Sequence, residues 1–185
     1  MAYAVPETAE TARLTLRRAR VTDAEAIFRA YATDPEVTRF LSHRPPTGPE
    51  QTRAFLARAQ ADWDAGSRFA SVILRGGRVL GMIEARPTPG MVNYGYVLAR
   101  AAWGQGCMTE VLHWHLAHSL AQPGIWRAEA LCDAENLASA RVMEKAGMRR
   151  EGVLRRRLMV PALGPAPRDA LIYAGVRAGT QPAGA

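Results

Sequence analysis

A turn with two glycines, between a strand-like and a helical segment, constrains this chain more than any other feature. Residues 94–98 are apolar and strand-like, and a helical pattern runs from about Cys107 to Leu120. Gly104 and Gly106 lie between the two segments. The first turn of a helix leaves N–H groups without partners, and glycine lets an anion come close to them. The pattern predicts a phosphate-binding turn or, as the alternative, only a tight strand-to-helix corner.

Other parts of the sequence help to decide between a phosphate-binding turn and a simple strand-to-helix corner. There is no GxxxxGK[ST] and no GxGxxG, which argues against the two standard phosphate loops. A later segment reads N-x-x-S-x-x-V-x-E-K-x-G and follows another strand-like run. In this order the chain resembles the GNAT acetyltransferase superfamily, whose members transfer acetyl from acetyl-CoA to amines. The likeness is greatest to the branch of ribosomal-protein N-terminal acetyltransferases. The stretches that carry it are Trp103–Glu110, Ala134–Met148, Glu151-Gly152 and Arg168-Asp169.

The expected architecture is a single α/β (α+β) domain. A length of 185 residues suits one domain with its own core. The resemblance implies a mostly antiparallel, splayed central sheet of about seven strands, flanked by about four helices. We expect residues 1–11 to be a flexible lead-in, residues 12–178 to form the acetyltransferase domain, and residues 179–185 to be a disordered tail.

The resemblance also implies how acetyl-CoA would bind. Backbone amides of the turn would hold the pyrophosphate, and the preceding strand would pair through its backbone with the pantetheine arm. Asn136 would hydrogen-bond the pantetheine, and Ser139 would lie near the sulfur. Trp103 and Met108 depart from the superfamily pattern, but the site tolerates Met108 if its side chain points into the core. The expected cofactor-binding residues are Val97, Leu98, Trp103, Gly104, Gln105, Gly106, Cys107, Met108, Thr109, Asn136 and Ser139.

Acyl transfer to an amine requires a neutral amine, a donor for the carbonyl oxygen and a proton for the leaving thiolate. Many superfamily members have a tyrosine acid where this chain has Met143, so Ser139 is our candidate for protonating the thiolate. Members of the closest branch often have Glu where this chain has Asn93, which is not a base. Glu84 is the first candidate base and Asp133 the second. An α-amine, with a pKa near about 7.7–8.0, could also react without one.

The acceptor is expected to be the α-amine of a peptide or protein N-terminus, or a small amine. The rival hypothesis is a CoA-binding regulatory or interaction module that has lost catalysis. The net charge of +7 raises a nucleic-acid function as a third possibility. The arginines are spread along the chain, however, so we expect no dedicated nucleic-acid site.

The remaining sequence features indicate a cytoplasmic enzyme that needs no metal. No apolar run approaches the roughly 20 residues that cross a bilayer, and no secretion signal is visible. The cysteines, Cys107 and Cys132, have no metal-like spacing and are expected to be reduced. A homodimer is possible by analogy with the family.

Overall fold

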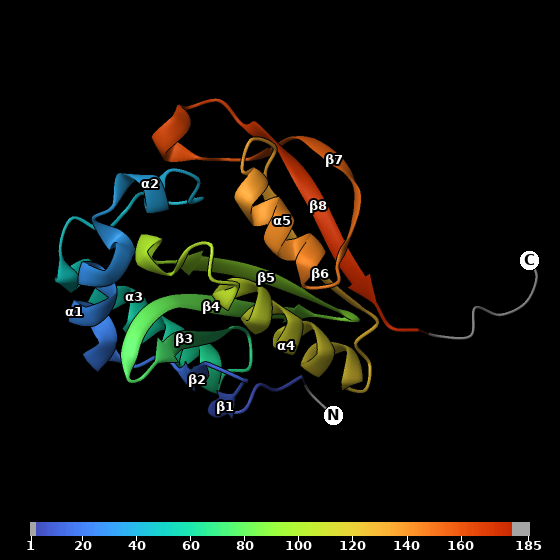
Figure 1. Ribbon diagram of the computed structural model, residues 1–185, viewed down its shortest axis with the longest axis horizontal. Helices are drawn as coiled ribbons and strands as arrows, with labels where there is room; N and C mark the ends of the chain where they lie inside the picture. The colour runs from blue at the N-terminus through green and yellow to red at the C-terminus, as the bar shows by residue number, and fades with distance from the viewer. Residues whose placement is uncertain (1–2, 179–185) are drawn as a thin grey trace, which may run out of the picture.

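A computed structural model describes residues 3–178 and is built around one eight-stranded sheet (Figure 1). The strand order is β1-β2-β3-β4-β5-β6-β8-β7. All neighbouring strands are antiparallel except β5 and β6, which are parallel. The mostly antiparallel α/β architecture is therefore confirmed. The strands are Thr8–Glu10 (β1), Thr15–Arg18 (β2), Phe69–Arg75 (β3), Arg78–Thr88 (β4), Met91–Leu98 (β5), Arg127–Asp133 (β6), Arg149–Leu158 (β7) and Arg168–Val176 (β8).

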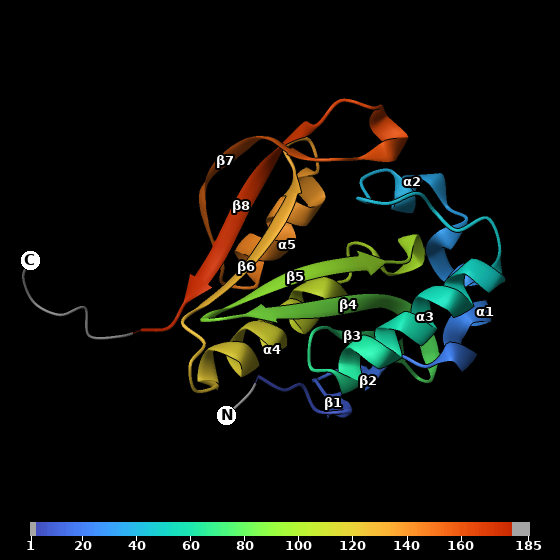
Figure 2. The ribbon, with the colours of Figure 1, turned by 180° about the vertical axis from the view of Figure 1, so that it is seen from behind.

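Helices cover both faces of the sheet (Figures 1 and 2). In Figure 2, α3 and α1 lie over β2 to β4, whereas α4 and α5 lie on the opposite face in Figure 1. Five α-helices occur in residues 3–178, against the expected four or so. They are Ala24–Ile27 (α1), Pro35–Thr38 (α2), Pro49–Asp64 (α3), Cys107–Ala121 (α4) and Leu137–Lys145 (α5), with 3-10 or π turns at Val21–Asp23, Phe28–Ala32, Arg100–Ala102 and Pro161–Leu163.

The beginning of the chain differs from the expected flexible lead-in. Residues Thr8–Glu10 form β1 and pair antiparallel with Thr15–Arg18, which accounts for the additional strand. Val5 is buried in the core, and the Tyr3 hydroxyl lies 2.9 Å from Ser119 Oγ on α4. These contacts are tertiary, so the local sequence pattern did not reveal them. The expected tail, 179–185, lies outside the described residues.

The two faces of the sheet have separate apolar cores. One core joins α1 and α3 to the face that carries Val72 and Met82. The other joins α4 and α5 to the face that carries Ile83 and Tyr94. Because successive strand residues point to opposite faces, β4 contributes Met82 to one core and Ile83 to the other. The central strands are thus fixed from both sides, and their ends can support a site.

The parallel strands β5 and β6 separate after a short ladder. Pairing runs from Met91 with Arg127 to Tyr94 with Ala130. Beyond these pairs, β5 continues to Leu98 and β6 to Asp133. Each strand remains fixed on its other side, since β4 pairs with β5 and β8 pairs with β6 along these residues. The central sheet is therefore splayed as expected, and we call this opening the split.

Candidate functional site

The glycine turn leads directly into α4 and offers unpaired backbone donors. Gly104 and Gly106 have φ angles of +72° and +73°, a left-handed conformation that glycine adopts without strain. Gly106 is the N-cap residue of α4, and no side chain caps this helix end. The N–H groups of Cys107, Met108 and Thr109 thus occupy the helix turn that lacks intrahelical partners. Together with the helix dipole, they can bind an anion.

Side chains of the turn hold it against the end of β5. Trp103 Nε1 donates to the carbonyl of Leu98 at 2.7 Å, and Gln105 Nε2 donates to the carbonyl of Ala101 at 2.7 Å. The indole of Trp103 is otherwise substantially exposed, with 45% of the residue accessible. Trp103 therefore connects the strand to the turn through its ring nitrogen. This contact gives it a structural role in a position where the superfamily usually has Arg or Gln.

The two residues after Gly106 point away from the anion site. Cys107 and Met108 are 1% and 3% exposed and belong to the core beneath α4. The condition under which the turn tolerates Met108 is thereby met. Only the backbone amides of these residues can face a ligand.

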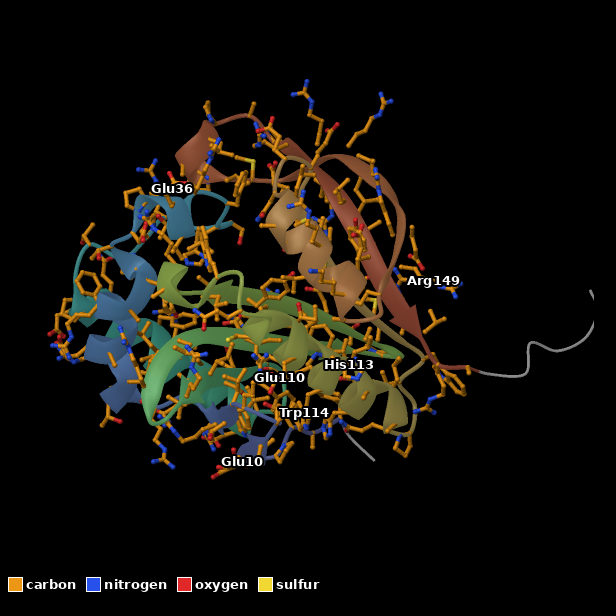
Figure 3. The ribbon with its side chains drawn as sticks, viewed as in Figure 1. Glu10, Glu36, Glu110, His113, Trp114 and Arg149 are labelled. Carbon is orange, nitrogen blue, oxygen red and sulfur yellow. The ribbon has the colours of Figure 1, made fainter. Side chains whose placement is uncertain are left out.

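Arg13 was not identified from the sequence, yet it fixes the same turn. Its Nη1 donates to the carbonyl of Gln105 at 3.0 Å, and its Nε donates to Glu110 Oε2 at 2.7 Å. Glu110, near the start of α4 in Figure 3, also accepts from Thr11 Oγ1 at 2.6 Å. Burial alone would raise the pKa of the Glu110 carboxyl, but the hydrogen bonds from Thr11 and Arg13 hold it below its usual value. Glu110 is thus an anchor between the N-terminal segment and α4.

Backbone alternation decides which residues of β5 face the split. The N–H of Ala99 donates to the carbonyl of Leu80 on β4 at 2.7 Å. Because backbone groups of successive residues point to alternate edges of a strand, those of Leu98 and Tyr96 face the split. The backbone groups of Val97 face β4 instead. Of the two residues expected to pair with pantetheine, the geometry favours Leu98 over Val97.

A phenol and a hydroxyl meet across the split. Tyr96 on β5 places its OH 2.7 Å from Ser139 Oγ and 3.2 Å from the carbonyl of Ser139 on α5. Burial raises the pKa of the Tyr96 phenol, and the hydrogen bond with Ser139 only partly opposes this. The phenol therefore keeps its proton at neutral pH. The sequence pattern did not single out Tyr96, because it falls within a run typical of an ordinary strand.

Asn136 and Met143 have local roles in α5. Asn136 is the N-cap residue, and its Oδ1 accepts from the N–H of Ser139 at 3.1 Å. Its amide NH₂ remains as the group that can reach a ligand. Met143 is 0% exposed and lies in the core. The helix position where many relatives have a tyrosine acid therefore points away from the split, and Tyr96 supplies a phenol from β5.

The two expected base candidates are placed differently. Glu84 is partly buried, and its oxygens lie 3.7 Å from Arg68 Nη1 and 3.7 Å from Arg86 Nη1. Asp133 is 2% exposed and accepts from Arg168 Nε at 2.5 Å and from Arg168 Nη2 at 3.2 Å. These bonds, with one from the N–H of Glu135 at 2.9 Å, occupy the Asp133 carboxylate. Asp133 thus holds the end of β6 in place, which leaves it poorly suited to act as a base.

One cavity of about 1900 Å³ connects these groups. It is lined by the turn, by the edge of β5, by the start of α5 and by residues of α2 and α3. The sequence-derived candidates that line it are Glu84, Val97, Leu98, Trp103, Gly104, Gly106, Cys107, Met108, Thr109, Asp133, Asn136 and Ser139. Gln105 is not part of this lining. His43 and Glu36 also line the cavity, with Glu36 on α2, away from Glu110 and His113 on α4 (Figure 3).

Two negative findings apply to residues 3–178. In this range, no three His, Cys, Asp or Glu side chains are grouped so that they could hold a metal ion. Over the same residues, no helix has the length and apolar character needed to cross a membrane.

Comparisons with known proteins agree with this arrangement. The chain is 30% identical over 156 residues to the N-acetyltransferase p20 of Bacillus licheniformis, covering 80% of this chain and 86% of that protein. The fold matches that of RimJ from Mycobacterium smegmatis, solved with a CoA disulfide, with a TM-score of 0.82 and 26% identity over 95% of this chain and 90% of that one. It also matches RimL, a ribosomal L7/L12 α-N-protein acetyltransferase solved with coenzyme A. That match has a TM-score of 0.81 and 20% identity over 95% and 98% of the two chains, and shows the fold alone.

The family assignment follows from the domain match together with this geometry. The model of the acetyltransferase (GNAT) domain matches residues 13–149, which is more than half of the chain. That range contains the turn, the split, Tyr96 and Ser139. The protein therefore belongs to the GNAT acetyltransferase family and is an acetyl-CoA-dependent N-acetyltransferase.

Proposed function

We propose that the acceptor is the α-amine of a peptide or protein N-terminus, which attacks acetyl-CoA directly in a ternary complex. The observation that carries this proposal is the split, which has a turn without a side-chain cap at one end and the Tyr96–Ser139 pair beside it. The size of the cavity and its continuation past α2 and α3 favour a chain end over a small enclosed amine. The likeness to RimL, which acts on a ribosomal protein, points the same way.

In this proposal the cofactor lies along the turn and the edge of β5. The pyrophosphate accepts hydrogen bonds from the amides at Gly104–Thr109, with the exposed face of Trp103 beside it. The pantetheine pairs with the backbone of Leu98 and receives a hydrogen bond from the Asn136 amide. The thioester then lies where β5 and β6 separate, because that is where β5 has a free backbone edge.

The chemistry assigned to the chain is proton transfer and positioning. The amine nitrogen attacks the thioester carbonyl carbon, the C–S bond breaks, and the CoA thiolate takes a proton. Ser139 Oγ supplies that proton, and the neutral Tyr96 phenol orients and replenishes it. Glu84, held between Arg68 and Arg86, is a candidate to receive the proton of the amine.

Direct attack is favoured over a covalent cysteine intermediate. Burial raises the pKa of the Cys132 thiol to about 11, so the thiol stays protonated and weakly nucleophilic. Cys107 is 1% exposed in the core beneath the turn. The two cysteines are unpaired, which is consistent with a cytoplasmic location.

Met108, Asn93 and Met143 are the residues that favour the rival, a CoA-binding module without catalysis, because each departs from the pattern of the family. The buried positions of Met108 and Met143 weaken the case for this rival, because both side chains belong to the core. A small amine acceptor and a homodimer remain alternatives that the same experiment can include.

The test combines binding with turnover. Isothermal titration with CoA and acetyl-CoA is run beside a thiol-release assay against N-terminal peptides and small amines. Binding together with thiol release on peptides alone is the expected outcome. Release on small amines but not peptides would replace the acceptor class. Binding without turnover on any acceptor would favour the module, and no binding of CoA would refute the role of the turn.

A further inference from the structure

We propose that Glu129 on β6, rather than Glu84, is the carboxylate that binds the acceptor ammonium and removes its proton. This inference rests on the proposed function and assigns a catalytic residue that the sequence pattern did not indicate.

The position of Glu129 in the sheet places it at the beginning of the split. Glu129 is paired with Asn93, immediately before the last pair of the parallel ladder, Tyr94 with Ala130. Side chains alternate along a strand, so Asn93 and Gly95 of β5 share a face with Glu129. Gly95 has no side chain, and Glu129, Asn93 and Gly95 all line the cavity. An acceptor that reaches the split from this face meets Glu129 and the Arg86 guanidinium, which extends over Gly95.

Hydrogen bonds from Arg127 and Asn93 hold the Glu129 carboxylate in place. Its side chain is 14% exposed, and Oε2 accepts from Arg127 Nε at 2.9 Å. Asn93 Nδ2 donates to Oε1 at 3.3 Å, a long contact that a charged donor can displace. Arg127 also donates to both oxygens of Glu151, at 2.9 and 2.6 Å. Glu129 therefore shares the Arg127 guanidinium with a second carboxylate, and a further cation on this face is Arg86, whose guanidinium extends over Gly95.

Glu84 has the opposite environment. Arg68 and Arg86 each approach its carboxylate to 3.7 Å, so two guanidinium groups lie beside Glu84, of which Arg68 also pairs with Asp62 at 3.5 Å. The guanidinium of Arg86 extends over Gly95, between Glu84 and the split. An incoming ammonium would meet this positive charge before it reached Glu84. Electrostatic repulsion therefore disfavours Glu84 as the first contact of the acceptor.

The other carboxylates that line the cavity are poorer candidates for the base, because of their hydrogen-bond partners or their position in the fold. Asp133 is bound by Arg168, and Glu110 by Thr11 and Arg13 at the turn. Glu36 is exposed on α2, outside the strands β5 and β6 that form the split. Among residues 3–178, Glu129 is thus the carboxylate that combines partial burial, a place at the split and a guanidinium shared with a second carboxylate.

The step assigned to Glu129 is a proton transfer. The ammonium of the acceptor donates to Glu129 Oε1 in place of Asn93. Glu129 Oε1 first takes one proton from the ammonium and passes it to water, which frees the nitrogen lone pair. The neutral amine then forms the bond to the thioester carbonyl carbon, and its second proton moves to Oε1 as the tetrahedral intermediate collapses. The C–S bond breaks, and the thiolate is protonated from the Tyr96–Ser139 side, so the charges on the two sides balance.

The experiment compares Glu129→Gln with Glu84→Gln, because both changes remove a charge and keep the side-chain shape. The readouts are acetyl-CoA affinity, titration of the CoA-loaded protein with a peptide that the unsubstituted enzyme acetylates, and the pH profile of kcat/KM. We expect Glu129→Gln to bind acetyl-CoA normally, to bind the peptide about tenfold more weakly, and to lose roughly 100-fold in kcat together with the acidic limb of the profile. Glu129→Asp should recover part of the rate.

Each outcome separates this inference from the proposed function. Peptide affinity and kcat that stay within about threefold in Glu129→Gln overturn the inference and leave the function intact. A larger loss in Glu84→Gln than in Glu129→Gln reassigns the role to Glu84. If Glu129→Gln fails to bind acetyl-CoA, it is misfolded, and the decision passes to Glu129→Asp, whose unchanged rate and pH profile would also overturn the inference. An unsubstituted enzyme that acetylates no acceptor refutes both proposals.

Discussion

Replacing Gly104 with alanine tests whether the backbone of the turn binds the cofactor phosphates. Gly104 has a φ of +72°, and a Cβ there would meet no protein atom within 4 Å. The space beside it is therefore open to a ligand, and a methyl group would occupy part of that space. Gly66, at the end of α3, provides a matched control, since its φ is +69° and its Cβ would also meet nothing within 4 Å. Gly66 does not line the cavity.

The two substitutions should have the same cost in stability but different costs in binding. An alanine in the left-handed conformation costs about 1–2 kcal/mol, and neither site adds a steric clash. Only Gly104→Ala holds a phosphate away from the backbone donors. Losing one charge-assisted hydrogen bond costs about 1.5–3 kcal/mol, which corresponds to a roughly 10- to 150-fold weaker Kd.

Urea unfolding measures the first quantity, and isothermal titration with CoA measures the second. We expect both variants to be destabilised equally, and only Gly104→Ala to bind CoA more weakly. A Gly104→Ala protein that binds CoA as tightly as Gly66→Ala would show that the turn is only a strand-to-helix corner. The role assigned to its amides would then be wrong.

Three further changes test the sheet, the split and the core. A Cβ at Gly81 would overlap the carbonyl oxygen of Val97, so Gly81→Ala should cost about 1–3 kcal/mol or more in urea unfolding, whereas Gly152→Ala, with open space, should cost well under that. Tyr96→Phe removes the partner of Ser139 Oγ, and thiol release should show kcat lowered roughly 3- to 10-fold with an unchanged Kd for acetyl-CoA. Burial lowers the pKa of His115 from 6.5 to about 3, so its contribution to stability is fully present above pH 6.5 and is lost as the pH falls toward 3. Between pH 7.5 and pH 5, urea unfolding of the native protein should lose about 2 kcal/mol that His115→Leu does not lose; equal losses would contradict the assignment.

Much of the architecture follows from local patterns. The turn, the start of α4 at Cys107 and the end of α5 before Gly147 are determined by glycine conformation and helix periodicity, which act over a few residues. The strand β1 could not be predicted in this way. It contains only Thr8–Glu10, and it is held by pairing with β2 and by contacts of its neighbours with α4. Local propensity says little about a segment of this length, because its stability comes from tertiary contacts.

The same limit applies to the site. Residues whose predicted role depends on their own backbone, such as those of the turn, could be proposed from the sequence. Tyr96 and Ser139 are 43 residues apart, and Asn93 and Glu129 are 36 residues apart. They meet only because β5 and β6 pair in one particular parallel register. A one-residue shift in that register would move the Glu129 side chain to the opposite face.

Asn93 has a different meaning in the sequence and in the sheet. Seen by itself, an amide where relatives often have a carboxylate suggests a lost base and favours a protein without catalysis. In the sheet, the Asn93 amide is a donor to the carboxylate of Glu129 on the adjacent strand. The carboxylate is thus supplied by Glu129 and is held by the Asn93 amide, so a group that could accept the proton of the amine is present. Residue type at one position therefore does not decide whether a carboxylate is present at the split; the register of the neighbouring strand does.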